Sequence, residues 1–258
     1  MKTKIIVSSL IAIVAFNANA LTAERLAEVK KKDMKILEEM GLPAFNSGIQ
    51  VVPRSQLGMP DEVLKVGQAE ASQREELGYA EKDEPYVAEL LAMKVNAPHD
   101  LKLMAGNLNE GSTHLRKSTA DLKLAFKFKG VEGNKKMLSY GGDIGVLGAA
   151  PQGSFNPDNG WSGAAQFFTV KNIGVCSYAV MNVKASGTAA MLAMEDVTYD
   201  VHDKATLIKV DGSKNSGFLY KVEWFDDENF HDLQCANSQY SKQINHDVIN
   251  LARMVDKS

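Results

Sequence analysis

The chain has 258 residues, of which 45% are hydrophobic, and a formal net charge of −3 at pH 7. This is enough for one large or two small domains with a core that holds together without a metal. The slightly acidic charge argues against nucleic acid as a partner.

The first twenty residues have the three parts of a secretory signal peptide. Two lysines precede an apolar run at residues 5–16, and Ala18 and Ala20 supply the small residues of a cleavage site. We therefore expect cleavage after Ala20 and a mature N-terminus at Leu21. A helix of about twelve residues spans about 18 Å, which is too short for a membrane anchor. The sequence predicts an exported protein, periplasmic or extracellular, with no transmembrane segment after cleavage.

Residues 21–105 are predicted to form a helical and loop-rich N-terminal region. Apolar residues recur at three- and four-residue spacing over 22–40, which predicts a helix, and three prolines and three glycines mark 41–60 as an extended connection. The polar stretch 61–84 predicts either a helix or a mobile linker.

Pro85 then opens a compact apolar helix at residues 86–93. We expect this helix to end before Pro98, because proline disrupts the interior of a helix.

Residues 106–258 are predicted to be a disulfide-linked α+β domain. Short runs of alternating or β-branched residues are separated by turn residues, and such short turns favour an antiparallel, meander-like sheet. The sequence 188–195 predicts a short helix, and the apolar stripe of 240–255 predicts a C-terminal helix packed across one face of the sheet. The predicted strands are 121–129, 135–140, 165–170, 175–183, 197–201, 206–210, 218–225 and 231–235.

Cys176 and Cys235 are the two cysteines of the chain. In an oxidising compartment two lone cysteines usually pair, so we expect a disulfide between them. The alternative is two free thiols.

Four of the five histidines are followed by aspartate. Imidazole and carboxylate are the groups that a metal site or an acid–base pair would use, which makes His202, Asp203, His231 and Asp232 weak candidates for such a site. However, neighbours on a strand point to opposite faces of the sheet. We therefore expect His231 to pack beside Leu233 and Cys235, and His202-Asp203 to form a turn. The remaining pairs are His99-Asp100 and His246-Asp247.

Two further segments invite a functional interpretation. The glycine-rich stretch 141–148 lacks the order of a nucleotide-binding loop, so its glycines are expected to permit bends or close backbone approach. The loop from there to Trp161 is expected to lie over the sheet and to offer a binding surface. The acidic run 226–229 is expected to be a hairpin turn.

No catalytic motif, cofactor motif or metal-ligand spacing is found, so no cofactor and no metal are expected. The sequence favours an exported non-catalytic binding or interaction protein, whose partner could be a protein, a surface polymer or a small ligand. The alternative is an exported hydrolase, possibly metal-assisted. A membrane-active protein that uses the basic face of Lys123, Lys127 and Lys129 is a third possibility.

Overall fold

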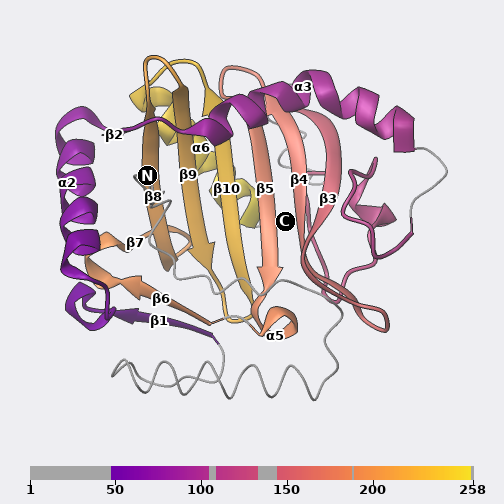
Figure 1. Ribbon diagram of the computed structural model, residues 1–258, viewed down its shortest axis with the longest axis horizontal. Coiled ribbons are helices and arrows are strands. Elements are labelled where there is room, and N and C mark those ends of the chain that lie inside the picture. The colour runs from indigo at the N-terminus through magenta and orange to yellow at the C-terminus, as the bar shows by residue number, and fades with distance from the viewer. Residues whose placement is uncertain (1–47, 105–108, 133–143, 188, 257–258) are drawn as a thin grey trace, which may run out of the picture.

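The computed structural model describes residues 48–104, 109–132, 144–187 and 189–256. The predicted signal peptide, the helix at 22–40 and the strand at 135–140 lie outside these residues. The fold is α+β, as predicted: a large, mostly antiparallel sheet of eight strands carries a helix on each face (Figure 1).

The large sheet consists of two antiparallel three-stranded runs that meet at β5 and β10. The strand order is β2-β8-β9-β10-β5-β4-β3, with β7 paired to β8. The strands confirm the predictions between residues 165 and 235. Their bounds are Ile144–Asn156 (β3), Gly160–Val170 (β4), Gly174–Asn182 (β5), Lys204–Ser213 (β8), Gly217–Phe225 (β9) and Asn229–Asn237 (β10), with the short strands Ala80–Glu81 (β2) and Thr198–Val201 (β7).

A second, two-stranded parallel sheet pairs β1 (Gly48–Val52) with β6 (Ala189–Ala193). The predicted helix at 188–195 is wrong, because this segment forms β6 followed by the 3-10 turn Met194–Asp196. Its alanine, methionine and leucine residues favour a helix locally. Pairing with a strand about 140 residues earlier overrides that preference.

Two helices, described next, cover opposite faces of the large sheet (Figure 1). On one face, Val87 and Leu90 of α3 (Pro85–Met104) pack against Leu219 and Ala236. On the other face, α6 (Lys242–Asp256) buries one apolar stripe, and Ser241 accepts hydrogen bonds from the first backbone N–H groups of the helix. The α6 residues in the core are Val248, Leu251, Ala252 and Val255.

The prediction that the first of these helices ends before Pro98 is wrong, since α3 continues through it to Met104. Pro98 lies on the exposed side of the helix, as does Lys94 one turn earlier. Water can therefore reach the carbonyl that Pro98 leaves without a helical donor.

The polar stretch 61–84 contains a helix, α2 (Asp61–Leu77), in which no residue is buried. The helix ends at Gly78, whose φ of +87° is a left-handed conformation that favours glycine. A Cβ at Gly78 would lie 1.7 Å from the Tyr240 hydroxyl oxygen, so any other residue there would also have to displace the Tyr240 side chain.

The predicted strand at 121–129 is wrong, although its burial alternates as expected. Phe126 and Phe128 are half-buried and Lys127 and Lys129 are exposed, but the segment makes only an isolated bridge, between Leu124 and Trp161. It follows the 3-10 turn Thr119–Asp121 and lies against the end of β4 instead of pairing along a strand.

The prediction of a long loop up to Trp161 is also wrong for the described residues from 144 onward, because residues 144–170 form the β3–β4 hairpin. The β3 ladder has an irregularity between Val146 and Gly148. A Cβ at Gly148 would lie 2.8 Å from the Arg116 carbonyl oxygen. This is the close backbone approach that the sequence suggested for these glycines.

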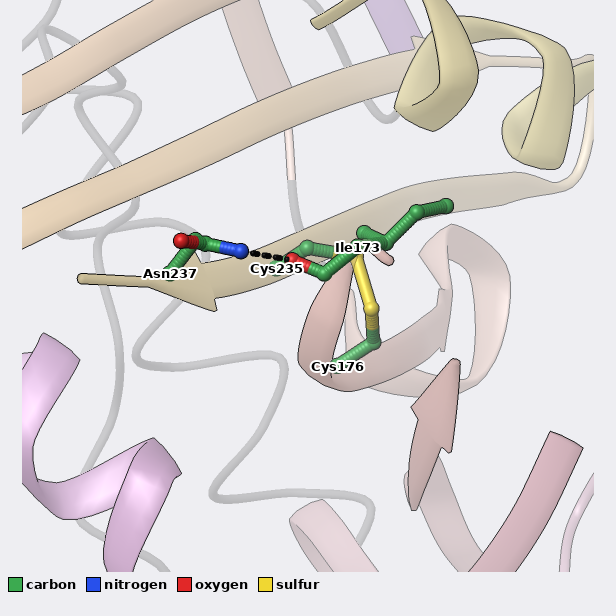
Figure 2. The surroundings of a disulfide bond; sticks show 4 residues. All are labelled: Ile173, Cys176, Cys235 and Asn237. Carbon is green, nitrogen blue, oxygen red and sulfur yellow. Dashed lines mark hydrogen bonds between the residues drawn. A yellow bond between two sulfur atoms is a disulfide. The ribbon is translucent and has the colours of Figure 1, made fainter. Parts of the chain in front are cut away.

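The predicted disulfide is present and joins the two halves of the sheet. Cys176 on β5 and Cys235 on β10 lie directly opposite each other, with their Cα atoms 4.1 Å apart, and both are fully buried (Figure 2). Nearby, the Asn237 side chain donates to the Ile173 carbonyl at 2.7 Å and ties the ends of the same strands together.

The remaining elements are the 3-10 turn Arg54–Gln56 and the single-turn helix α5 (Val183–Ser186). Among the described helices, none combines the length and the apolar character needed to cross a membrane.

Candidate functional site

A polar pocket opens on the α6 face of the sheet, where residues of β5, β8 and β10 lie beside the last turn of α6. Its volume is about 180 Å³. The pocket contains three kinds of group: the partly apolar surface of Tyr178, Val180 and Val255; the imidazole of His231 with Asn229; and five charged side chains. These are Lys127, Lys129, Lys204, Asp226 and Asp256.

His231 is held on both of its ring nitrogens. Nε2 lies 2.9 Å from Asp226 Oδ2, and Nδ1 lies 2.8 Å from the Tyr178 hydroxyl. A carboxylate only accepts, so Nε2 donates to Asp226, and in the neutral ring Nδ1 accepts from the phenol. The ring also stacks on Trp224, with centroids 4.9 Å apart, and the residue is 8% exposed. The imidazole is therefore fixed in orientation.

The two partners of His231 have opposite protonation preferences. Burial raises the pKa of the Tyr178 hydroxyl, and the nearby carboxylates Asp256 and Asp226 raise it further. For Asp226, burial alone would raise the pKa, but hydrogen bonds from His231 and from the backbone N–H groups of Glu228 and Asn229 hold it well below its usual range. At neutral pH Tyr178 is therefore a neutral phenol and Asp226 a carboxylate.

Asp256 gathers a second set of side chains at the end of α6. Its Oδ1 accepts from Trp224 Nε1 at 2.8 Å and from Lys204 Nζ at 2.5 Å, and its Oδ2 lies 2.9 Å from His202 Nδ1. Although burial opposes ionisation, these donors lower the pKa of Asp256. The helix end is thereby joined to β8 and β9 on the rim of the pocket.

His202 and Asp203 form the turn that the sequence predicted. They connect β7 to β8 as the two central residues between Val201 and Lys204, with φ values of 48° and 60°. Positive φ at both central residues is the signature of a type I′ hairpin turn, which follows the twist of the strands.

The four candidate residues do not come together as one set. His231 and Asp256 both line the pocket, and His202 contacts Asp256 from outside the lining. The structure therefore brings the two histidines to one region. Asp203 is exposed in its turn, and Asp232 points to the opposite face of the sheet, as expected for neighbours on a strand. His231 packs on the face of Leu233 and Cys235, which is the environment that the sequence suggested.

The other two His-Asp pairs lie on the surface. The side chains of His99 and His246 are 71% and 64% exposed, and each ring nitrogen is 3.8 Å from the adjacent carboxylate. In the described part of the chain no three His, Cys, Asp or Glu side chains are arranged to hold a metal ion.

No protein-family model, curated protein or solved structure matches this chain. The chemistry of the pocket therefore follows from its own residues.

Sequence reasoning missed Tyr178, Asp226 and Asp256 as members of the site. Asp226 does act as the predicted turn residue, since its Oδ1 accepts the backbone N–H of Glu228 and of Asn229, but its second oxygen binds His231. One signal was available: if the 218–225 and 231–235 strands pair as a hairpin, Trp224 comes to lie opposite His231. Nothing in the sequence pointed to Asp256.

The three lysines of the predicted basic face lie in two different places in the structure. Lys127 and Lys129 line the pocket, where Lys204 joins them. Lys123 instead binds Glu110 at 3.0 Å and the Pro157 carbonyl at 2.8 Å. The lysines of this segment therefore do not form one continuous basic surface.

Proposed function

We propose that this chain is an exported protein, periplasmic or extracellular, which binds a small ligand in the α6-face pocket and does not act on it chemically. Export rests on the signal-like first twenty residues, and the buried disulfide is compatible with it. The observation that carries the binding proposal is a pocket whose polar groups are held in place by one another.

The engagement of His231 is what favours binding over catalysis. A general base needs a ring nitrogen that can take a proton from a substrate or a water molecule. Here both ring nitrogens are engaged, Nδ1 with the Tyr178 hydroxyl and Nε2 with the Asp226 carboxylate. Tyr178 is itself buried and its raised pKa keeps it protonated at neutral pH, which makes it a poor nucleophile.

A hydrolase remains the second candidate because of one observation: the order carboxylate, imidazole, hydroxyl in Asp226, His231 and Tyr178 is the order used in nucleophilic triads. For that chemistry Tyr178 would have to be exposed, whereas it is 2% exposed. The metal-assisted form would need Asp203 or Asp232 beside the histidines, and both point elsewhere.

The test compares ligand binding by the wild-type protein with binding by a variant whose pocket is filled by a larger side chain. Val180 lies on the pocket wall, so Val180→Phe would fill the cavity, and Val180→Ile is the matched control that adds a single methylene. A fragment library screened by NMR against the full chain should yield ligands that bind the wild type and Val180→Ile. The same ligands should not bind Val180→Phe. Fragments that bind all three proteins equally, or turnover of a substrate that is lost on His231→Gln, would contradict the proposal.

A further inference from the structure

We infer that Asn159 is a site of spontaneous modification, at which the side-chain amide is lost and the residue becomes aspartate or isoaspartate. Asn159 lies in the turn between β3 and β4, away from the α6-face pocket, so this inference is independent of the proposed binding function. It rests on the residue that follows Asn159, on the exposure of the turn, and on the backbone that lies against it.

Asn159-Gly160 is the one Asn-Gly step in the sequence. When asparagine loses its amide, the backbone nitrogen of the next residue attacks the side-chain carbonyl carbon. A side chain on that next residue hinders the approach, and glycine has none. Each of the other asparagines precedes a residue that carries a side chain. The sequence therefore favours the reaction at Asn159 above all other positions.

The turn presents the Asn159 side chain to water. Asn156 pairs with Gly160 across the turn, and its side-chain oxygen accepts the backbone N–H groups of Asp158 and Asn159 at 2.8 Å and 3.1 Å. Asn159 is exposed, and no hydrogen bond to another described residue holds its carboxamide. Gly160 is the first residue of β4, and the end of a strand opens at a lower free energy than its middle. The reacting groups can therefore meet without unfolding of the sheet.

The turn between β8 and β9 offers an internal comparison. Asn215 is exposed there, as Asn159 is in its own turn, but it is followed by Ser216. The Ser216 side chain hinders the attack, and the Ser216 backbone N–H also donates to Ser213 Oγ at 3.1 Å. Asn215 should therefore keep its amide under conditions in which Asn159 loses it.

The reaction needs water and no other reactant. The Gly160 nitrogen forms a bond to Asn159 Cγ, the bond from Cγ to the side-chain nitrogen breaks, and ammonia leaves with the proton of the Gly160 N–H. Water then opens the resulting cyclic imide at either of its two carbonyl carbons. Opening at Cγ gives aspartate. Opening at the backbone carbonyl gives isoaspartate, in which the main chain runs through Cγ and is longer by one carbon.

The longer main chain of isoaspartate conflicts with the close packing around Gly160. This glycine has a φ of +94°, and a Cβ there would lie 2.4 Å from the Lys123 carbonyl oxygen. Trp161 donates its backbone N–H to the same carbonyl at 2.9 Å, and Ala125 donates to the Trp161 carbonyl at 2.9 Å. Isoaspartate shifts Gly160 along the chain and should break these two hydrogen bonds. Aspartate leaves the main chain unchanged and should keep them.

The experiment incubates the full chain at mildly alkaline pH, where the attacking nitrogen loses its proton more readily. Peptide mapping by mass spectrometry should find aspartate and isoaspartate accumulating at position 159, with Asn215 unchanged. Asn159→Gln keeps an amide but moves its carbonyl carbon one bond further from the backbone, and should stay unmodified. Hydrogen exchange at Ala125 and Trp161 should become faster in proportion to the isoaspartate fraction. Asn159→Asp is the matched control, since it adds the charge alone and should keep the wild-type exchange rates.

Three results would overturn the inference. Loss of the amide at Asn215 as fast as at Asn159 would show that exposure in a turn decides and the following residue does not. An Asn159 that keeps its amide in the folded chain, while a peptide digested from the same protein loses it, would show that the turn blocks the attack. Unchanged exchange at Ala125 and Trp161 in a chain rich in isoaspartate would reject the effect on the packing against Lys123.

Discussion

Asp232 on β10 lies directly opposite Glu223 on β9, on the sheet face that also carries α3. The Glu223 side chain is buried, and Asp232 Oδ1 is buried with no hydrogen-bond partner in the described part of the chain. The Gln234 amide donates to Asp232 Oδ2 at 2.5 Å. Burial and the neighbouring Glu223 carboxylate raise the pKa of Asp232 to about 7, and burial also raises that of Glu223. Lys221 and Lys209 partly oppose these shifts.

We predict that this pair makes the protein less stable as the pH rises from about 4 to about 7. Over this range Asp232 is ionised in the unfolded chain but keeps its proton in the folded one, so unfolding releases a proton and a rise in pH favours the unfolded state. The free energy of unfolding should fall by at most about 1.4 kcal/mol per pH unit for one proton. Asp232→Asn should flatten this slope in denaturant titrations at pH 4.5, 6 and 7.5.

The matched control is Asp227→Asn, which removes an exposed carboxylate from the adjacent turn and should keep the wild-type slope. An unchanged slope in Asp232→Asn would show that Asp232 titrates normally.

Asp211 anchors α2 and β2 to the sheet. This buried carboxylate binds Arg74 of α2 at 2.5 Å, Lys221 at 3.2 Å and Lys82 at 3.3 Å. Burial opposes its ionisation, but these cations lower its pKa to about 2. Its stabilising contribution is therefore present above pH 4 and is lost as the pH falls towards 2.

Asp211→Asn should cost about 3–5 kcal/mol in urea unfolding at pH 7, because it leaves buried cations without their partner. Since α2 has no buried residue of its own, limited proteolysis should also cut faster between residues 61 and 77. Asp200→Asn breaks the exposed pair with Arg253 and should cost less than about 1 kcal/mol. Equal effects of the two variants would refute the anchoring role of Asp211.

Loss of the Cys176–Cys235 disulfide should destabilise the protein by about 2–5 kcal/mol, because the bond closes a loop of 59 residues. The Cys176→Ala/Cys235→Ala variant should show this loss in thermal unfolding, and wild type treated with reductant should approach it. The double variant should not respond to reductant. Two free thiols in the denatured, unreduced wild type would contradict the bond.

The His202-Asp203 turn allows a paired test of backbone strain. Asp203 is exposed at φ 60°, so Asp203→Gly should maintain or raise stability by up to about 1 kcal/mol, and Asp203→Ala should lower it by a similar amount. His202→Gly relieves the same kind of strain but loses the bond to Asp256, and should therefore gain less than Asp203→Gly. Thermal unfolding of the three variants decides the order. Equal stability of the glycine and alanine variants at 203 would mean that the turn is not held in this conformation.

Export predicts a mature N-terminus at Leu21. Mass spectrometry of protein from the periplasm or medium should find it, and Ala20→Lys should block cleavage because the peptidase needs a small residue there. An intact Met1 on exported wild-type protein would contradict the prediction.

The sequence predicted correctly those helices and strands whose conformation depends on residues close to them in the chain. β9 and α6 have continuous apolar or periodic sequences, and both form where expected. β6 does not, because its conformation depends on pairing with β1, which lies far away in the chain. The segment 121–129 shows the other limit: its alternation gives the burial of Phe126 and Phe128, but none of the described strands forms a ladder with it.

The candidate site was less predictable than the fold, because its pairs are distant in sequence. His231 uses Asp226 instead of its neighbour Asp232, and His202 uses Asp256 instead of Asp203. A His-Asp dipeptide suggests a pair, yet a strand separates the two side chains to opposite faces and a tight turn directs them apart. Only the hairpin of β9 and β10 and the position of the α6 terminus determine the actual partners.

The strand order places the last strand of the chain, β10, at the centre of the sheet between β9 and β5. The chain is synthesised from its N-terminus, so β3, β4 and β5 are made well before β10, and the inner edge of β5 stays unpaired until β10 follows. An unpaired edge is a template for wrong strand partners. A chain that ends before residue 229 would thus expose the edge of β5 in the middle of the sheet, where a second incomplete chain could pair with it.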